Sequence, residues 1–409
     1  MTNYEELKWR GLIKDEAGDL EEIINKGGFT FYWGTDPTAD SLHIGHYSSL
    51  ITAKRLARMG NNPILLVGGA TGLIGDPRPT AEREIISKEE VLDNVEAIKK
   101  QVMNIFDGKC EVVNNYDWTK EFSLIDFLRD IGKYINVNYM LDKDIIRRRL
   151  ETGITFAEFT YTLMQGYDFL YLFREKNCIM QVEGSDQWGN ITTGIELIKK
   201  IENKEAYGFT MPLILDASGN KFGKSEGNAL WLDEAKTSSY ELYQYLINTS
   251  DDKVEEYLKV FTFLSREEIE DIMKKHNEKP EERIAQEALA HEFIKDLHGE
   301  ESYTRALNIS KSLFSGNIKD LSEQELTEAF KNIDSYDINE DINIVELLVN
   351  AGICSSKREA REFIGNNSIS INGEKVNDLE YTISKKDTLY DKYVVIRRGK
   401  KKYYVINYQ

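Results

Sequence analysis

The sequence of 409 residues has little of what membrane, secreted and metal-binding proteins need. It contains no run of about 18 or more apolar residues, so no segment is expected to span a membrane. The N-terminal stretch MTNYEELKWRG is charged and lacks an apolar core, so secretion is not expected. Three cysteines, far apart and without metal-ligand spacing, suit a reducing compartment. We therefore expect a cytoplasmic protein without a protein-held metal ion.

Positive charge is also scarce. Lys and Arg number 52 against 70 Asp and Glu, which gives a formal net charge of −18. Such an acidic surface argues against general affinity for nucleic acids. The balance reverses in residues 343–409, where basic side chains outnumber acidic ones. This asymmetry indicates an RNA-facing module at the carboxyl end of an acidic body.

The most informative stretch reads FTFYWGTDPTADSLHIGHY. Residues 29–33 alternate with the period of a strand, and small and apolar residues recur at helical spacing over 42–57. A strand, a glycine-containing loop and a helix N-terminus form an anion site, because free backbone N–H groups face the loop. His43 and His46 lie on one face of the first helical turn and can reach one ligand. Gly45 between them leaves room for a nucleotide.

Strands and helices alternate through the first half of the chain. The expected strands are residues 29–33, 63–67, 110–113, 178–182 and 209–215. The expected helices are residues 1–28, 42–60, 88–106, 122–150, 156–173 and 191–201. Continuous apolar runs are typical of parallel strands that are covered on both faces. The alternation predicts an α/β fold with a Rossmann-like, doubly wound parallel sheet.

Polar residues follow two of these strands. Asp76 comes after the strand at 63–67, and Asp186 and Gln187 come directly after the strand at 178–182. Open α/β sheets bind their ligands outside the carboxyl ends of the strands. These side chains are therefore candidates for ligand contact.

One strongly apolar helix, FAEFTYTLMQGYDFLYLF, carries three polar side chains on one face. They are Tyr161, Gln165 and Asp168. Burying them without partners costs ~1–3 kcal/mol each. They must therefore be paired inside the core or bind a polar ligand, and the sequence alone leaves both open.

Basic residues occur in two places that suit phosphate. Lys221, Lys224 and Ser225 lie in the glycine-rich segment DASGNKFGKSEGN, where two lysines can stabilise charge that develops on phosphates. The triplet at 147–149 is Arg-Arg-Arg. Either group can equally be a solvated surface.

Taken together, these motifs resemble the bacterial tyrosyl-tRNA synthetases of class I over nearly the whole chain. The stretches that carry the resemblance are GTDPTADSLHIGHY, GATGLIGDP, TYTLMQGYDFL, GSDQWGNIT and KFGKS. The C-terminal unit resembles a small RNA-binding module shared with a ribosomal small-subunit protein and some pseudouridine synthases. The resemblance implies activation of L-tyrosine with ATP to tyrosyl-adenylate and pyrophosphate, followed by transfer to the 3′-terminal adenosine of tRNA(Tyr).

The resemblance also assigns residues, with Tyr32 and Asp168 on the phenolic hydroxyl of the substrate. The implied tyrosine-binding residues are Tyr32, Asp76, Tyr161, Gln165, Asp168, Gln181 and Gln187. The implied ATP-binding residues are Gly34, Asp36, His43, Gly45, His46, Gly184, Asp186 and Lys224. The implied catalytic residues, which stabilise the departing phosphates, are Thr38, His43, His46, Arg83, Lys221, Lys224 and Ser225. The implied tRNA-binding residues are Arg147, Arg148, Arg149, Lys199, Lys200, Lys357, Arg358 and Arg361. Mg²⁺ is expected to accompany the substrate ATP, and the protein is expected to be a homodimer.

The expected domains follow the same resemblance. They are a catalytic Rossmann-like domain at 1–215, a mobile KFGKS loop and connector at 216–237, an all-helical tRNA-binding (anticodon) domain at 238–314, a linker at 315–342 and a small α+β RNA-binding module at 343–409.

The sequence departs from the family pattern at three places. Trp33 replaces a small residue, Glu183 stands where glycine is common, and the segment before Arg83 is one residue short and lacks a customary lysine. The first two departures flank the expected nucleotide site, and the third concerns a pyrophosphate contact.

Two alternatives belong beside this interpretation. A tryptophanyl enzyme shares the architecture, but an indole offers one N–H donor and no phenol for Tyr32 and Asp168 to recognise. An RNA-binding protein on a retired synthetase scaffold would be favoured by a decayed phosphate site. Both histidines and both loop lysines are present, which favours the enzyme.

Overall fold

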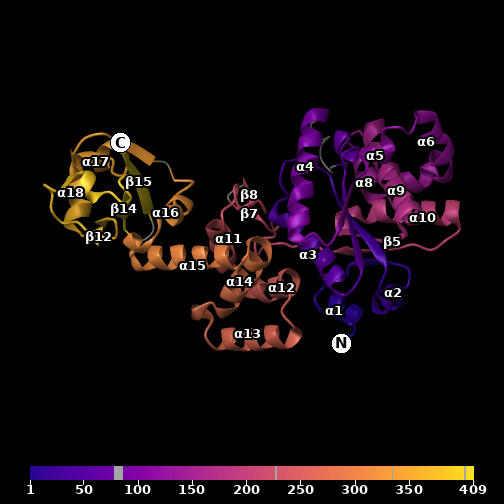
Figure 1. Cartoon of the computed structure of the whole chain (residues 1–409), viewed down its shortest axis with the longest axis horizontal. Coiled ribbons are helices and arrows are strands. Elements are labelled where there is room, and N and C mark those ends of the chain that lie inside the picture. The colour runs from indigo at the N-terminus through magenta and orange to yellow at the C-terminus, as the bar shows by residue number, and fades with distance from the viewer. Residues whose placement is uncertain (78–85, 226–227, 334, 400–401) are drawn as a thin grey trace. The chain divides into compact units, whose positions relative to one another are not determined.

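The computed structural model describes residues 1–77, 86–225, 228–333, 335–399 and 402–409 (Figure 1). Arg83 lies outside the described residues. Within the described ranges, no helix has the length and apolarity needed to cross a bilayer. The chain forms two compact units. One is Met1–Thr237 with Leu246–Leu297, and the other is Ser238–Tyr245 with His298–Gln409.

The first unit is built on a six-stranded sheet of order β1-β6-β5-β2-β3-β4. The strands are β1 (Asp15–Ala17), β2 (Thr30–Thr35), β3 (Asn62–Val67), β4 (Glu111–Asn114), β5 (Cys178–Gly184) and β6 (Tyr207–Met211). All neighbours are parallel except β1 and β6. The strand order reverses between β2 and β5, and open α/β sheets bind ligands at such a switch point. The predicted doubly wound sheet is confirmed, with an antiparallel edge strand added.

Helices cover both faces of this sheet, with α3 and α4 on one side and α9 and α10 on the other (Figure 1). The helices are α1 (Asn3–Trp9), α2 (Leu20–Lys26), α3 (Ile44–Arg58), α4 (Lys88–Ile105), α5 (Tyr116–Thr119), α6 (Leu124–Asp130), α7 (Val137–Leu141), α8 (Asp144–Leu150), α9 (Phe156–Lys176) and α10 (Trp188–Glu202), with 3₁₀ turns η1 (Thr71–Leu73), η2 (Gly132–Tyr134) and η3 (Ser185–Gln187). Alternation along β2 sends neighbouring side chains to opposite faces. The ring of Tyr32 packs on Phe169 of α9, whereas the Trp33 indole donates to Ser49 of α3.

Further helices complete the first unit. They are α12 (Asp251–Phe261), α13 (Arg266–Glu278) and α14 (Ile284–His298), with the 3₁₀ turn η4 (Pro280–Glu282). Tyr47 of α3 packs on Phe293 of α14 at 4.6 Å between ring centroids and donates a hydrogen bond to Asp296. Phe222 stacks on Phe261 of α12 at 4.5 Å. These helices therefore share a core with α3.

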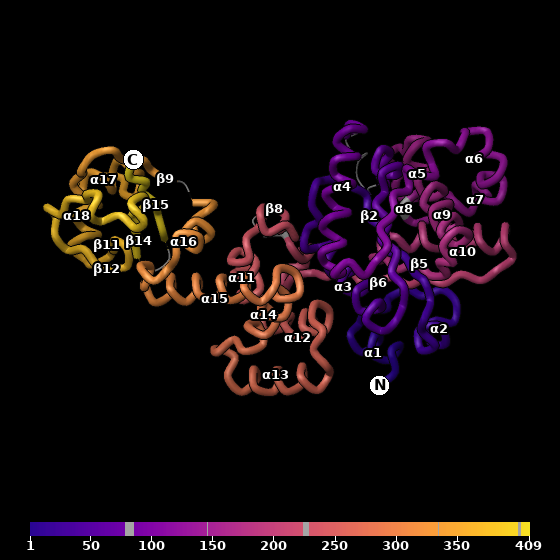
Figure 2. Tube along the Cα trace, viewed as in Figure 1, coloured from indigo at the N-terminus to yellow at the C-terminus, as the bar shows by residue number. Residues whose placement is uncertain are grey.

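The second unit combines helices with an antiparallel sheet of order β12-β11-β14-β15-β9, in which β9 alone is parallel to its neighbour (Figure 2). Its strands are β9 (Ser335–Ile338), β11 (Ile369–Ile371), β12 (Glu374–Lys375), β14 (Tyr393–Arg398) and β15 (Lys402–Tyr408), and β10 (Ile342–Asn343) pairs with β13 (Thr382–Ile383). Its helices are α15 (Glu300–Ser315), α16 (Glu323–Ala329), α17 (Ile344–Asn350) and α18 (Lys357–Gly365), with the 3₁₀ turns η5 (Ile318–Asp320) and η6 (Lys385–Asp387), and α11 (Ser239–Ile247) begins in this unit.

Three segments differ from the sequence predictions. The predicted linker at 315–342 contains α16 and β9, whose sparse apolar residues face a shared core with β14 and β15. The N-terminal 28 residues contain β1 between two short helices, and 122–150 is broken into three α-helices. In all three segments a few apolar residues are scattered among polar ones. This pattern predicted one continuous helix or no regular structure, whereas packing against the rest of the protein determines the elements that form.

Candidate active site

The loop after β2 delivers two imidazoles to the first turn of α3. His43 is the N-cap residue, its Nδ1 accepts from the backbone N–H of Gly45 at 3.1 Å, and His46 Nδ1 accepts from the His43 N–H at 3.3 Å. The two rings stack with centroids 3.8 Å apart. Because both Nδ1 atoms accept hydrogen bonds, each neutral ring carries its proton on Nε2 and presents a donor there. The predicted pair of histidines is thus brought together at a helix N-terminus.

Gly45 is required by this stacking. A Cβ at Gly45 would come within 2.9 Å of His43 ring atoms and 3.4 Å of the Phe222 carbonyl oxygen. The absent side chain therefore makes room for the imidazole of His43, in addition to any ligand.

Helix α4 holds the loop between β2 and α3. Asn94 donates to the Pro37 carbonyl at 3.1 Å. Gln101 accepts from the Leu42 N–H at 2.9 Å and donates to Ser41 at 3.0 Å. Thr38 lies in this loop with its side chain exposed. These side chains fix the backbone that carries Thr38 and His43.

The KFGKS segment is held against the same helix N-terminus. The Ile44 N–H donates to the Leu230 carbonyl at 2.8 Å, and the Leu230 N–H donates to the Gly223 carbonyl at 3.0 Å. Gly223 has φ +88°, and a Cβ there would lie 2.0 Å from Ile44. Only glycine suits this backbone. The loop is therefore fixed at its Phe222–Gly223 base, next to the two histidines.

The predicted loop cations are only partly described. Lys221 is exposed. Lys224 and Ser225 form the short strand β7 (Lys224–Ser225), paired with β8 (Asn228–Ala229). The positions of the Lys224 and Ser225 side chains lie outside what the structure describes. Their predicted role in phosphate binding stays a prediction.

A group of unpaired polar atoms lies between β2, β5 and α9. Among the described residues, the Tyr32 hydroxyl, the Gln165 Oε1 and both amide atoms of Gln181 are buried without a hydrogen-bond partner. Tyr32 and Gln181 are directly opposite in the β2–β5 ladder. Each such group costs ~1–3 kcal/mol when buried unpaired. Several of them in one place indicate a pocket that is completed by a polar ligand.

Asp168 of α9 is 2% exposed, and its charge acts on the Tyr32 hydroxyl of this group. Its Oδ2 accepts from Asn115 Nδ2 and its Oδ1 accepts from Trp118 Nε1, both at 2.9 Å. Burial raises the pKa of Asp168 to about 7, although the two hydrogen bonds act in the opposite direction. Burial, together with the charges of Asp168 and Glu183, raises the pKa of the Tyr32 hydroxyl well above its usual range. Tyr32 is therefore a protonated donor at neutral pH.

Two further groups of predicted residues come together. Tyr161 donates to Asp36 Oδ2 at 2.8 Å, and Thr71 donates to Asp36 Oδ1 at 2.7 Å. Gln187 donates to Asp76 Oδ2 at 3.0 Å. Gly34, Gly184 and Asp186 lie at the carboxyl ends of β2 and β5 and complete the set around the crevice.

Sequence reasoning missed several side chains that hold this arrangement. They are Thr71, Asn94, Gln101, Asn115, Trp118 and Asn190, the last of which donates to Gln187 at 2.8 Å. Asn115 follows β4 directly, so the rule that singled out Asp76 at a strand end also applies to it. Trp118 gave no such signal, because an indole in a short helix is usually a core residue.

The predicted tRNA contacts divide by exposure. Arg147, Arg148 and Lys199 are exposed. Arg149 is 4% exposed and forms an ion pair with Glu158, itself 2% exposed, at 2.9 Å. The tRNA assignment of Arg149 is therefore wrong, because its guanidinium is enclosed by the protein and fixes α8 to α9. In the second unit, Arg358 and Arg361 of α18 are exposed, and Lys357 pairs with Glu346 at 2.7 Å.

Comparisons with known proteins agree with this geometry. Residues 25–315 match the family described as tRNA synthetases class I (W and Y), and residues 325–406 match the family described as Tyrosine--tRNA ligase SYY-like C-terminal domain. Relatives named tyrosine--tRNA ligase from Streptococcus gordonii and from Streptococcus pyogenes are 49% identical, with all of both chains covered. A C-terminally truncated mitochondrial tyrosyl-tRNA synthetase from Aspergillus nidulans is 35% identical, with a TM-score of 0.69 over 76% of this chain and 94% of that one. The chain belongs to the tyrosine–tRNA ligases, an enzyme family of the class I aminoacyl-tRNA synthetases.

Proposed function

We propose that the described pocket and the adjoining helix N-terminus divide the first reaction step between them. The carboxylate of tyrosine attacks the α-phosphorus of ATP in line, an acyl–phosphate bond forms, and the bond to pyrophosphate breaks. The attacking carboxylate is already ionised at neutral pH, so no protein base is required. The protein's contribution is to position both substrates and to stabilise the charge on the leaving pyrophosphate.

The pocket of unpaired polar atoms supports tyrosine as the amino acid. Tyr32 and Asp168 lie on the walls of an otherwise apolar space, and a phenol can both accept from Tyr32 and donate to Asp168. Phenylalanine leaves the Tyr32 hydroxyl unpaired and offers no donor to Asp168, which keeps only its hydrogen bonds from Asn115 and Trp118. Tyrosyl-tRNA synthetases are the standard example of that discrimination. Asp76, Tyr161 and Gln165 would then bind the α-ammonium, and Gln181 and Gln187 would complete the polar rim of the pocket.

The phosphates of ATP fit the helix N-terminus of α3. His43 and His46 present their Nε2 donors there, Thr38 lies in the preceding loop, and the KFGKS segment begins beside them. Among the described residues, no cluster of three or more acidic, histidine or cysteine side chains is placed to hold a metal ion. We therefore assign Mg²⁺ to the ATP phosphates, with which it enters as part of the substrate.

The experiment that tests this function is tyrosine-dependent exchange of pyrophosphate into ATP, without tRNA. Exchange with tyrosine but not with phenylalanine or tryptophan supports the proposed pocket and the adenylate step together. Absence of exchange with all three amino acids, from folded protein, would refute the proposal.

The raised pKa of Asp168 predicts a pH dependence. Ionised Asp168 accepts the hydrogen bond that the phenol donates, whereas protonated Asp168 must first lose its proton. We expect kcat/KM for tyrosine to be constant above about pH 7 and to fall by up to tenfold per unit below it. The profile is measured by exchange with saturating ATP. The Asp130→Asn variant, which changes a carboxylate on α6, should keep this limb, and a wild-type profile that stays level well below pH 7 would contradict the prediction.

For the second step we propose that the acceptor end of tRNA meets the exposed Arg147 and Arg148 and the adjacent Lys199. Lys200 is engaged with the Tyr134 carbonyl and with Glu196. Arg358 and Arg361 of α18, in the second unit, would contact another part of the tRNA. The relatives that match over the full chain are bacterial, and we propose the cytoplasm as the place of action.

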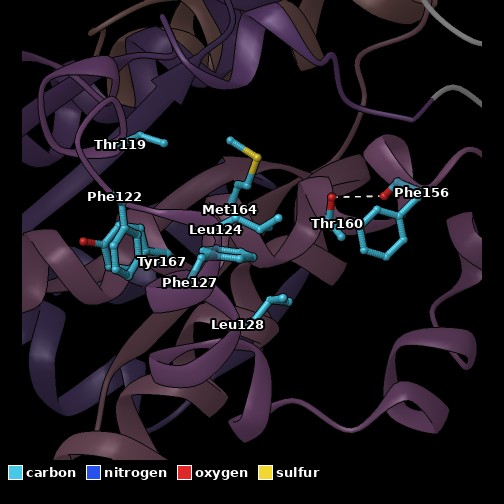
Figure 3. A pocket seen from close by; sticks show the side chains of 9 residues that line it. All are labelled: Thr119, Phe122, Leu124, Phe127, Leu128, Phe156, Thr160, Met164 and Tyr167. Atoms are coloured by element: carbon cyan, nitrogen blue, oxygen red, sulfur yellow. Dashed lines mark hydrogen bonds between the residues drawn. The ribbon is translucent and has the colours of Figure 1, made fainter.

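We further propose that the chain functions as a homodimer through an apolar surface formed by α6 and the start of α9. Phe156 is 72% exposed, Leu124 is 68% exposed and Leu128 is 52% exposed. Figure 3 shows these side chains around an open pocket of about 280 Å³, with Phe122 and Tyr167 stacked on one wall. Exposed apolar surfaces of this kind mark protein contacts. Tyr167 and Met164 lie on α9 next to Asp168 and Gln165, so one helix serves both the pocket and this surface.

The homodimer prediction is tested with the double variant Leu128→Asp, Phe156→Asp. We expect sedimentation or light scattering to change from dimer to monomer, because two carboxylates would have to be buried in the apolar contact. Leu92→Asp is the matched control, since Leu92 is also an exposed leucine (38%) but lies on α4, away from this surface. A double variant that remains dimeric would place the contact elsewhere.

A further inference from the structure

A carboxyl group lies at the switch point between β2 and β5. The β2–β5 ladder ends at the pair Tyr32 and Gln181. Beyond it, the backbone N–H of Gly34 donates to Oε1 of Glu183 at 2.6 Å. The Gly34 N–H therefore bonds to a side chain of β5 instead of to a backbone carbonyl of that strand. This happens at the sheet edge where open α/β sheets bind ligands.

The second oxygen of this carboxyl group is unpaired. Within the described part of the chain, Glu183 Oε2 has no hydrogen-bond partner, and the residue is 5% exposed. The charges that act on Glu183 come from Asp186, Asp36 and Asp76, all of them acidic. A buried carboxyl group usually has a cation or several donors around it. Glu183 has one donor, the Gly34 N–H, and its Oε2 is available for another.

The neighbouring side chain cannot supply the second donor. Trp33 precedes Gly34 on β2, but its indole N–H donates to Ser49 at 3.0 Å, and Ser49 donates to the His46 carbonyl at 3.0 Å. Trp33 is 2% exposed and fills the α3 side of the sheet. Trp33 therefore leaves the second oxygen of Glu183 available to a ligand at the carboxyl ends of β2 and β5.

The chemistry of the substrates limits what that ligand group can be. Phosphates carry negative charge and accept hydrogen bonds, so an acidic surrounding disfavours them at Glu183. The remaining donors are the ribose hydroxyls, the adenine amino group and the tyrosine ammonium. The tyrosine ammonium is assigned above to Asp76, Tyr161 and Gln165, which leaves the ribose hydroxyls and the adenine amino group for Glu183.

We propose that Glu183 recognises the ribose of the bound nucleotide, holding the Gly34 N–H with Oε1 and a ribose hydroxyl with Oε2. This assignment rests on the proposed function and gives the nucleotide site a specificity-determining residue.

A neutral carboxyl group fits the same arrangement. Burial and the charges of Asp186, Asp36 and Asp76 raise the pKa of Glu183 well above its usual range, against the effect of the Gly34 N–H. A ribose hydroxyl suits either form of Glu183, because a hydroxyl can donate to an ionised carboxylate or accept from a protonated one, whereas an ammonium can only donate. Glutamine reproduces the protonated form, since its amide oxygen accepts and its amide nitrogen donates.

The test compares wild type, Glu183→Gln and Glu183→Leu in tyrosine-dependent exchange with ATP, 2′-deoxyATP, 3′-deoxyATP and inosine triphosphate. We expect wild type to prefer ATP over at least one deoxy analogue by about tenfold in kcat/KM. That ratio should approach one in Glu183→Leu and be largely retained in Glu183→Gln. Glu205→Gln, which removes an exposed carboxylate before β6, is the control and should behave as wild type.

Each other outcome overturns the assignment in a distinct way. If kcat/KM in Glu183→Leu falls equally with all four nucleotides, Glu183 acts only by supporting the Gly34 backbone. Discrimination lost only against inosine triphosphate would place it on the adenine. Weaker tyrosine binding without nucleotide, measured by equilibrium dialysis, would place it on the ammonium. Thermal melting shows that the variants are folded, and absence of exchange in wild type would refute the proposed function instead.

Discussion

Replacing Asp168 by Ala should abolish measurable tyrosine activation, with kcat/KM for tyrosine lowered by about 1,000-fold or more. The loss has two sources. The phenol of the substrate loses its acceptor, and Asn115 Nδ2 and Trp118 Nε1, which donate to this carboxylate at 2.9 Å, are left unpaired in a buried pocket. Pyrophosphate exchange at saturating ATP measures the effect.

The Asp168→Asn variant separates these sources. Its amide oxygen can keep the hydrogen bond from Trp118, but its amide nitrogen then meets the Asn115 amide donor. We expect it to be nearly as slow as Asp168→Ala and to discriminate less between tyrosine and phenylalanine. Asp130→Asn is the matched control, because it changes a half-exposed carboxylate on α6 that pairs with Arg129. Tyrosine activation close to wild type in either Asp168 variant would contradict the specificity assignment.

Much of this site could be predicted because its residues follow strand ends and a helical period. Tyr161, Gln165 and Asp168 share a helix face by spacing alone, and Asp76 follows a recognisable strand. The spacing of residues along the sequence does not show which side chain from another element will bond to them. Asn115 is 53 residues from Asp168 in the chain and bonds to it only after β4 and α9 have packed.

At Arg149 the sequence predicted a surface contact, whereas the structure shows a buried ion pair. A triplet of arginines at the end of a helix looks like a solvated or phosphate-binding surface. One of the three faces inward because the helical period of about 100° per residue directs neighbours to different sides, and Glu158 is there to receive it. Charge patterning along the chain does not reveal which arginine has a buried partner.

The strands of the central sheet could be predicted from the sequence, except for the edge strand β1. Parallel strands of the central sheet are continuous apolar runs, which the sequence displays directly. β1 is three residues long and contains Asp15 and Glu16, so nothing in its composition marks a strand. It exists because the edge of β6 offers unpaired backbone groups, with Asp15 opposite Thr210. Edge strands of this kind depend on the neighbour rather than on their own residues.

The second large effect is expected at the N-terminus of α3. Replacing His43 by Ala should lower kcat for tyrosine activation by about 100- to 1,000-fold and leave tyrosine binding unchanged. His43 has two separable functions in the structure. Its Nδ1 caps the helix through the Gly45 N–H, and its Nε2 is the donor that we assign to the departing pyrophosphate.

His43→Asn distinguishes the two functions, because asparagine is among the best N-cap residues and has no counterpart of Nε2. If the donor at Nε2 is what matters, His43→Asn restores the thermal stability lost in His43→Ala, a cap being worth about 1 kcal/mol, but stays equally slow. If the cap is what matters, His43→Asn recovers the wild-type rate, which would remove His43 from the catalytic set.

The ring of His46 stacks on His43 at 3.8 Å and accepts its backbone N–H. The effects of His43→Ala and His46→Ala should therefore not add in the double variant, because each imidazole helps to orient the other.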